Sequence, residues 1–344
     1  MKILFTHELF PPDVAGGGEL AVYEIAKRLK KEGIEIKVLT TGDPRIKEYD
    51  GIPTIRLPIN RYLMNLAFYS IYKHSKDIDL IHTNNYNACC PSYIAAKLSK
   101  TPILCHVHEV YNEKWLQMRG LIWGNISRMI ERLQVNHDFN KFIFFSEHMR
   151  NSGVDIGIPS EKTEVIKPGV EFKKFKMKKK EPFVLFVGNL IKRKGLDYLI
   201  QAAGDIPDID FVIVGKGKER ERLETVAPEN VKFLGYVSDE DLIDLYSRAL
   251  IFCLPSMGEG FGLVLLEAMA SGCAVVSTMP LDYEGINVKI GDIVELKNAL
   301  KSLLGKPKKT EKMGRKNRRK AKEYDWDKFI SRLIEIYKEV SYEV

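Results

Sequence analysis

A glycine-rich segment follows the first apolar run of the sequence. The segment FPPDVAGGGEL ends in Gly16, Gly17 and Gly18, just before a helix that we expect to begin near Glu19. Consecutive glycines let a ligand approach the backbone closely, and the N-terminus of a helix attracts negative charge. The spacing is not G-x-G-x-x-G, so the dinucleotide-binding fingerprint is absent. The segment therefore predicts either an anion-binding turn or a tight connection without a ligand.

Two histidines stand in the strand-like run PILCHVHE. Alternation along a strand sends His106 and His108 to the same face of a sheet, with His108 nearer the following loop. A histidine at this position is either structural or in contact with a ligand. The H-x-H spacing also fits a metal site, but no third ligand stands at a matching spacing, which argues against one.

Cations and carboxylates gather in the second half of the chain. Lys192, Arg193 and Lys194 follow the apolar run PFVLFVGN, directly before a helix. They would pair with a phosphate held at that helix start or form an ordinary basic loop. In GEGFGLVLLEAMASG, Glu259 lies in a glycine-rich turn and Glu267 lies eight positions later on an apolar helix. Glu259 is placed to hold sugar hydroxyls, and Glu267 needs a polar partner if it is buried.

Strand-like runs that alternate with amphipathic helical stretches position all these residues. The first series is KILFTHE, IEIKVLTT, LIHTNN, PILCHVHE and KFIFFSE, and the second is PFVLFVGN, DFVIVGKG, VKFLGYV, LIFCLPS and CAVVST. This alternation is typical of parallel βαβ sheets. We expect an α/β fold with two Rossmann-like, doubly wound parallel-sheet domains that face a central cleft.

The predicted domain boundaries follow from composition. We expect an N-terminal Rossmann-like domain over residues 1–168, a lysine-rich linker over 169–182 and a C-terminal Rossmann-like domain over 183–324. Residues 325–344 carry apolar side chains at helical spacing and predict a helix that packs back on the N-terminal domain.

Composition narrows the class of protein. The 344 residues are 45% hydrophobic and 29% charged, as in an ordinary globular chain of two domains. No run of 18 apolar residues and no secretory signal stands out, so we expect a cytoplasmic protein. The five cysteines lack C-x-x-C spacing, which predicts reduced, buried thiols.

The basic and aromatic stretches are compatible with contact between the protein and a membrane surface. The net charge of +7 gathers in residues 173–180 and 306–322, which predicts solvated surfaces or attraction to anionic lipid or a phosphorylated acceptor. The stretch RYLMNLAFYSIYK at residues 61–73 is apolar around much of its surface, so we expect it to pack in the core. The alternative is peripheral contact with the inner face of a membrane.

Several segments together resemble family 4 of the retaining glycosyltransferases, which have the GT-B fold. They are FPPDVAGGGE with the helix behind it, VHE, VGNL with KGLDYLI, VIVGKGKERERL, FLGYV and GEGFGLVLLEAMASGCAVVST, and YDWDKFISRLIEIYKEV resembles the family's closing helix. The resemblance implies a hexosyltransferase-type enzyme of glycan biosynthesis (EC 2.4). Its donor would be a nucleotide-diphosphate sugar, UDP- or GDP-linked, bound by the C-terminal domain. Its acceptor, on the N-terminal side, would be a glycan, a glycolipid or a small molecule that the sequence does not identify.

The resemblance also implies how the donor is held. Gly16 and Gly17 would bind the diphosphate, and Lys194 would neutralise it together with Arg193. Glu267 would hold the ribose. The segment that ends at Val237 would bracket the base.

The same resemblance implies catalytic roles for Glu259 and His108. Glu259 would grip the transferred sugar, helped by the amides of Gly260, Phe261 and Gly262, and His108 would contact that sugar near its reacting carbon. No nucleophilic carboxylate is evident, so front-side attack assisted by the donor phosphate is implied. No cofactor and no divalent metal would be required, because lysine, helix dipoles and amides stabilise the leaving diphosphate.

Two departures from the family pattern bear on the donor. Asn189 stands where the family has an arginine, so Lys192 or Arg193 would have to replace that cation. The loop after Thr278 is shorter than usual, and the identity of the sugar and base therefore cannot be carried over.

Other readings of the same sequence remain. A nucleotide-sugar 2-epimerase with the GT-B fold or a non-catalytic nucleotide-sugar-binding protein would share the architecture. A sugar phosphorylase would be longer than this chain. Nucleic acid is not expected as a partner, because the basic runs lack interleaved stacking aromatics.

Overall fold

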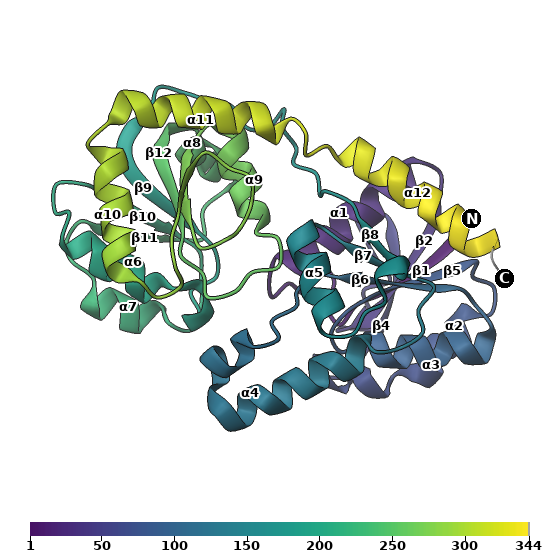
Figure 1. The fold of residues 1–344 in the computed structure, drawn as a ribbon. Helices are drawn as coiled ribbons and strands as arrows, with labels where there is room; N and C mark the ends of the chain where they lie inside the picture. The colour runs from purple at the N-terminus through teal and green to yellow at the C-terminus, as the bar shows by residue number, and fades with distance from the viewer. Residues whose placement is uncertain (343–344) are drawn as a thin grey trace. The chain divides into compact units, whose positions relative to one another are not determined.

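The computed structural model describes residues 1–342 and divides the chain into two compact units. The first unit contains Met1–Lys167 and the C-terminal segment that begins at Asp327, and the second contains Pro168–Trp326. Each unit consists of a β-sheet and the helices that pack on it (Figure 1).

The first unit has an eight-stranded sheet within the described residues, in the order β3-β4-β2-β1-β5-β6-β7-β8. All neighbouring strands pair in parallel except β3 and β4, which are antiparallel. The strands are β1 Lys2–Thr6, β2 Glu35–Thr41, β3 Glu48–Tyr49, β4 Ile52–Leu57, β5 Leu80–Asn84, β6 Ile103–Val107, β7 Lys141–Phe144 and β8 Thr163–Val165. Every residue of β5 and β6 is buried, as expected for central strands of a parallel sheet.

Helices cover both faces of this sheet. Successive residues of a strand point to opposite faces, so His82 and Thr83 on β5 mark the two sides. On one face, His82 contacts Tyr337 of α12 (Trp326–Tyr342), with 2.5 Å between Nδ1 and the tyrosine hydroxyl. On the other face, Thr83 accepts a hydrogen bond from the hydroxyl of Thr6. The Thr6 hydroxyl also lies 2.8 Å from that of Ser92 on α3. The unit's other helices are α1 Gly17–Lys31, η1 Arg61–Leu66, α2 Phe68–Ser75, α3 Cys89–Ser99, α4 Lys114–Val135, α5 Glu147–Asp155 and η2 Ser160–Lys162.

The C-terminal helix α12 belongs to the first unit by its contacts. Its apolar stripe is fully buried and comprises Phe329, Leu333, Ile336, Tyr337 and Val340. Arg332 adds an ion pair with Glu164, 3.2 Å away, next to β8.

The second unit has a six-stranded parallel sheet within the described residues, in the order β11-β10-β9-β12-β13-β14. The strands are β9 Glu181–Val187, β10 Phe211–Val214, β11 Val231–Gly235, β12 Ala249–Leu254, β13 Ala274–Ser277 and β14 Gly285–Asn287. The helices are η3 Lys192–Lys194, α6 Leu196–Gly204, α7 Arg220–Val226, α8 Asp239–Arg248, α9 Leu263–Ala270, α10 Ile293–Leu304 and α11 Pro307–Ala321. Residues 168–180 contain no helix or strand.

The expected fold class of two Rossmann-like parallel-sheet domains is confirmed, with local corrections. Helix α1 begins at Gly17 rather than near Glu19. The expectation that residues 61–73 pack in the core is confirmed for Met64, Ala67 and Ile71, which are buried. It is wrong for Tyr62, Leu66 and Tyr69, which are about 70% exposed. The stretch divides into η1 and α2, and a single layer of helix on a sheet buries only one face. Cys90 is half-buried, whereas the other four thiols are buried, and all five are free.

Candidate active site

His108 lies immediately after β6 and is fixed by two asparagines that follow or end β5. Its Nε2 donates to Asn84 Oδ1 at 2.6 Å, and its backbone N–H donates to Asn85 Oδ1 at 2.9 Å. Asn84 in turn donates to the carbonyl of Thr6, which orients its amide. Nε2 therefore carries a proton, and in the neutral ring Nδ1 keeps an accepting lone pair.

Three buried histidines, His82, His106 and His108, form a stack, and His7 lies edge-on to His108. His106 lies 4.5 Å from His108 and 5.6 Å from His82 between ring centroids, and His7 lies 6.2 Å from His108. The predicted same-face placement of His106 and His108 is confirmed. Burial lowers the pKa of His82, His106 and His108 well below the usual histidine value, and the neighbouring rings lower it further. These imidazoles are uncharged at neutral pH.

Glu8, two residues after the end of β1, is a buried carboxylate that sequence reasoning missed. Its side chain is 2% exposed and pairs with Arg61, while Asn87 donates its backbone N–H at 3.2 Å and its side-chain amide. Tyr86, beside these groups, has φ 101°, a region that non-glycine residues rarely adopt. The only signal for Glu8 was an acid at the carboxyl end of a strand.

The glycine segment has open space in front of the helix. Gly16 is the N-cap of α1 and makes no side-chain capping bond. A β-carbon added at Gly17 or Gly18 would meet nothing within 4 Å, and neither residue has a positive φ. Neither backbone conformation nor crowding therefore requires glycine at these two positions, and the open space leaves room in front of the N-terminus of α1.

In the second unit, Lys194 and Glu259 form a buried ion pair. Lys194 Nζ lies 2.5 Å from Glu259 Oε1, and the two side chains are 12% and 6% exposed. Lys194 ends η3 after β9, and Glu259 lies in the turn after β12. Because β9 and β12 are neighbours in the sheet, their following loops meet at the same edge.

Arg193 and Ser256 complete this cluster. Arg193 donates to the carbonyl of Gly258 at 2.6 Å and lies 3.9 Å from Glu259 Oε2, while the Ser256 hydroxyl donates to Glu259 Oε1 at 2.6 Å. Burial alone would raise the pKa of Glu259, but the charges of Lys194 and Arg193 and these hydrogen bonds outweigh it, so the pKa is lowered. Glu259 is therefore an ionised carboxylate in a dry setting.

The shortened loop after β13 is tied to the same turn. Thr278 donates from its hydroxyl to the carbonyl of Ser256 at 2.5 Å. Among the three basic residues of this turn, Arg193 and Lys194 contact the Glu259 carboxylate, whereas Lys192 is exposed. Asn189, which stands at the family's arginine position, is half-buried.

Glu267, on the second turn of α9, has a partner on α8. Tyr246 donates its hydroxyl to Glu267 Oε2 at 2.9 Å. Burial raises the pKa of Glu267 to about 7, the charge of Asp239 acts in the same direction, and the tyrosine bond opposes both. The carboxyl group is thus poised to lose its proton when a ligand offers hydroxyl donors. Sequence reasoning required a polar partner for Glu267 but could not name Tyr246.

The remaining predicted residues lie on neighbouring loops of the second unit. Gly262 has φ 74° and is the N-cap of α9, Gly260 is buried, and Phe261 packs 5.9 Å from Tyr324 between ring centroids. Val237 follows β11 and is half-buried, and within residues 1–342 no hydrogen bond or ion pair links it to Glu259 or Glu267. The second unit thus brings Lys194, Arg193 and Glu259 together and leaves Glu267 and Val237 on separate elements.

Two negative findings apply to the described part of the chain. Residues 1–342 contain no group of three or more histidine, cysteine, aspartate or glutamate side chains arranged to hold a metal ion. The same residues include no helix whose length and apolar character would let it cross a bilayer.

Comparisons with known proteins agree with this fold. The model described as Glycosyltransferase Family 4 matches residues 15–174, and the model described as Glycosyl transferases group 1 matches residues 169–320. An uncharacterized glycosyltransferase of Methanocaldococcus jannaschii is 26% identical over 362 residues, with 99% of each protein covered.

Two solved structures share the fold. Sucrose-phosphate synthase from Thermosynechococcus elongatus superposes with a TM-score of 0.85 at 22% identity over 100% of both chains. Anabaena HepE in complex with UDP-glucose superposes with a TM-score of 0.81 at 22% identity, over 98% of this chain and 100% of its own. The fold is GT-B. Together with the two family models, which span residues 15–320, these findings show that the chain belongs to the family 4 glycosyltransferases and is a glycosyltransferase.

Proposed function

We propose that the enzyme transfers a sugar from a UDP- or GDP-linked donor to its acceptor with retention of anomeric configuration and without a divalent metal. The buried cluster of Lys194, Arg193 and Glu259 carries this proposal. It combines two cations suited to a diphosphate with a carboxylate suited to sugar hydroxyls. The fold shared with Anabaena HepE, which was solved with UDP-glucose, supports a nucleotide-sugar donor.

Lys194 and Arg193 act on the leaving group in this proposal. As the bond from the anomeric carbon to the donor phosphate lengthens, negative charge gathers on the diphosphate. Two fixed cations in a dry site stabilise that charge without reorganisation. This set of positive groups takes the place that a divalent cation would otherwise fill.

Glu259 acts as a binding and charge-stabilising group. Its carboxylate is already engaged by Lys194 and Ser256, which reduces the electron density available for attack on carbon. A covalent intermediate on Glu259 is therefore disfavoured, and retention follows from front-side attack in which the donor phosphate accepts the acceptor's proton.

His108 acts as a neutral hydrogen-bonding group. Its Nε2 proton is committed to Asn84, so Nδ1 is left to accept a hydrogen bond from a hydroxyl group of the sugar or of the acceptor. The lowered pKa of His108 keeps this acceptor available at neutral pH.

A thermal-shift series with UDP-, GDP- and ADP-sugars in EDTA tests this function. Stabilisation by one nucleotide sugar, by several degrees at concentrations far above Kd, is the expected result. If no nucleotide sugar stabilises the protein in EDTA but one does with Mg²⁺ or Mn²⁺, the metal-independent mechanism is wrong. If none does under either condition, the donor assignment is wrong.

A further inference from the structure

Helix α4 is amphipathic, but its apolar face points away from the protein. From Leu121 onward it buries small and polar residues and exposes its apolar ones. The buried positions are Gly124, Ser127, Glu131 and Val135. The exposed apolar positions, between 37% and 75% accessible, are Leu121, Ile122, Trp123, Ile126, Met129, Ile130 and Leu133. Such a continuous apolar face on the outside of a protein marks an interaction surface.

Local contacts fix this orientation. Gly120 has φ 75° and breaks the helix into two segments that turn back on each other. A β-carbon at Gly124 would lie 2.7 Å from the Leu116 backbone, so only glycine permits this close approach. Glu131 accepts the backbone N–H groups of Tyr111 and Asn112, each at 2.8 Å. Rotation of the apolar face toward the protein would break the hydrogen bonds of Glu131 and the close contact at Gly124. These contacts therefore keep the apolar face on the outside.

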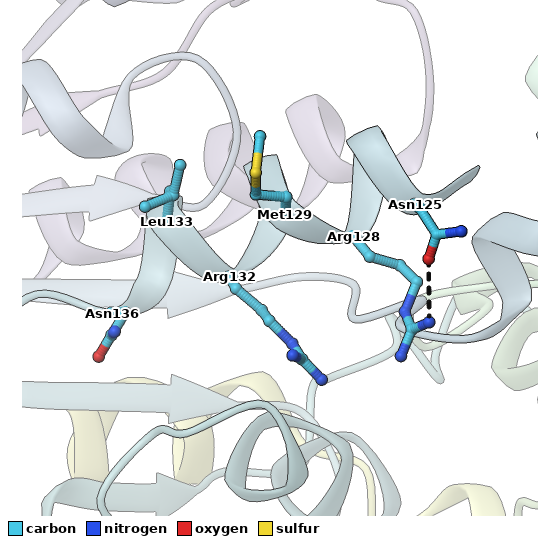
Figure 2. Close-up of a pocket in the computed structure, with 6 residues that line it drawn as sticks. All are labelled: Asn125, Arg128, Met129, Arg132, Leu133 and Asn136. Atoms are coloured by element: carbon cyan, nitrogen blue, oxygen red, sulfur yellow. Dashed lines mark hydrogen bonds between the residues drawn. The ribbon is translucent and has the colours of Figure 1, made fainter. Parts of the chain in front are cut away.

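The exposed charges beside the apolar face are positive. Arg128 and Arg132 line a shallow groove of about 280 Å³ along α4 (Figure 2), with Asn125, Met129, Leu133 and Asn136. Arg128 has one acidic neighbour, Glu113 at 3.6 Å, and Arg132 has no ion pair within residues 1–342. The one acid between residues 121 and 135 is the buried Glu131.

The neighbouring helices continue this surface. Helix α3 contacts α2, η1 and α4. Helices α2, α3 and α4 lie in the lower part of the first unit in Figure 1. These elements add exposed Tyr62, Leu66, Tyr69, Ile94 and Leu98. The sequences of η1, α2 and α3 contain lysine and arginine but no aspartate or glutamate. The nearby exposed acids, Glu113 and Asp138, pair with Arg128 of α4 and Lys97 of α3.

We propose that this face, centred on α4, docks on a membrane bilayer that contains anionic lipid. Leu121, Ile122 and Trp123 enter the boundary between headgroups and acyl chains, and Arg128 and Arg132 bind lipid phosphates. Apolar burial combined with attraction to anionic headgroups is the established energetics of interfacial helices, and tryptophan favours that boundary.

The positive charge of the α4 face favours an anionic bilayer over a second copy of this chain as the binding partner. A two-fold dimer through α4 would bring the arginines of both copies, Arg128 and Arg132, into one interface, and the exposed acid beside them, Glu113, already pairs with Arg128. A bilayer with anionic lipid supplies the matching charge. This docking goes beyond the proposed transfer reaction and requires neither donor nor acceptor.

Co-sedimentation of the full chain with vesicles tests the proposal. Binding to vesicles of phosphatidylcholine and phosphatidylglycerol, but only weakly to phosphatidylcholine alone, is expected. Removing two interfacial cations in R128Q/R132Q should weaken binding about thirtyfold at low salt. The control K308Q/K309Q removes two exposed charges from α11 and should bind as the unmodified chain does.

A second pair of variants tests the apolar contact. L121S/I122S should lose most vesicle binding, whereas V226S/V294S, which changes two valines of similar exposure in the second unit, should not. Trp123 remains in both pairs, and its emission should shift to the blue on binding. All four changes are at exposed positions, so melting temperatures should stay close to that of the unmodified chain.

Three results would overturn the proposal. The first is no binding to anionic vesicles. The second is equal binding by L121S/I122S and its control. The third is a concentration-dependent dimer in analytical ultracentrifugation that L121S/I122S abolishes, which would assign the face to a second copy of the chain.

Discussion

The ammonium group of Lys194 lies 2.5 Å from the carboxylate of Glu259, and both side chains are almost fully buried. In the free enzyme each charge neutralises the other. In the proposed function, donor binding shares Lys194 between Glu259 and the diphosphate, and this competition gives the two residues separable effects.

Replacement of Glu259 by alanine should reduce turnover far more than donor affinity. Without the carboxylate, Lys194 is free to pair with the diphosphate, so the dissociation constant of the nucleotide sugar should stay level or fall. The transition state loses its charge-stabilising group, and kcat should drop by about a hundredfold or more. Steady-state kinetics and calorimetry together check this split. A large loss of affinity with kcat preserved would contradict the assigned role.

Donor affinity should depend on pH through Glu267. Its pKa of about 7 lies above the ordinary glutamate value, so part of the population is protonated at neutral pH. Ribose hydroxyls donate to the ionised form, which means that binding requires the proton to leave. The dissociation constant should fall as pH rises from 5.5 to 7, by at most about tenfold per unit, and level off above pH 7.

E267Q provides the matched control for this titration. Its amide does not ionise, so its donor affinity should be lower than that of the unmodified enzyme above pH 7 and nearly constant with pH. An unchanged pH profile in E267Q would remove Glu267 from the ribose site.

Gly17→Ala should separate a ligand-binding role from a structural one. Gly17 is the first residue of α1, lacks a positive φ and has open space at its β-carbon position. Alanine should therefore leave the free energy of unfolding unchanged or raise it by up to about 1 kcal/mol. The added methyl group should nevertheless weaken donor binding, because it occupies the approach to the helix N-terminus.

Gly204→Ala is the comparison for that variant. Gly204 ends α6 and also has nothing within 4 Å of its β-carbon position. The Gly204→Ala variant should be as stable as Gly17→Ala. Its donor affinity should equal that of the unmodified enzyme. Equal donor affinity in all three proteins would show that Gly17 only forms a turn.

The histidine stack should make stability depend on pH. His82, His106 and His108 have folded-state pKa values below the unfolded value near 6.5, so the unfolded chain binds more protons in mildly acidic solution. Stability is complete above pH 6.5 and should fall as pH decreases below it. Urea denaturation between pH 5 and 8 measures this slope.

His106→Leu should reduce that slope by up to about a third, because it removes one of the three fully buried imidazoles whose pKa is strongly lowered. His74, His137 and His148, whose pKa values are also lowered, remain in both proteins. Neither ring nitrogen of His106 has a hydrogen-bond partner within residues 1–342, so leucine should cost little or nothing at pH 8. If the slope is the same in His106→Leu, the stack does not govern the acid response.

Most of the fold could be predicted because each strand carries a β-branched apolar run and each connection carries helical periodicity. Prediction of the Lys194 and Glu259 pair would have required one further fact, that β9 and β12 are neighbours in the sheet. In the sequence these two strands are separated by 61 residues that include β10 and β11. Each residue could be assigned to the end of its strand, but strand order is a property of the whole sheet.

Outward-facing apolar residues were harder to predict than buried ones. Residues 61–73 and α4 both show apolar side chains at helical spacing, and spacing alone does not say which face meets the protein. In α4 the answer depends on Gly124 and Glu131, whose partners lie elsewhere in the chain. Glu8 was missed for the same reason, since its burial arises from Arg61 and Asn87.

The most direct test of the proposed mechanism is calorimetric titration of the stabilising nucleotide sugar into the unmodified enzyme and Lys194→Ala, in EDTA and in MgCl₂. We predict equal dissociation constants for the unmodified enzyme in both buffers and binding at least about tenfold weaker for Lys194→Ala, because a fixed cation on the diphosphate is lost. Exposed Lys218→Ala should behave as the unmodified enzyme. Binding that needs MgCl₂, or that is undiminished in Lys194→Ala, would contradict a metal-independent donor site built on Lys194.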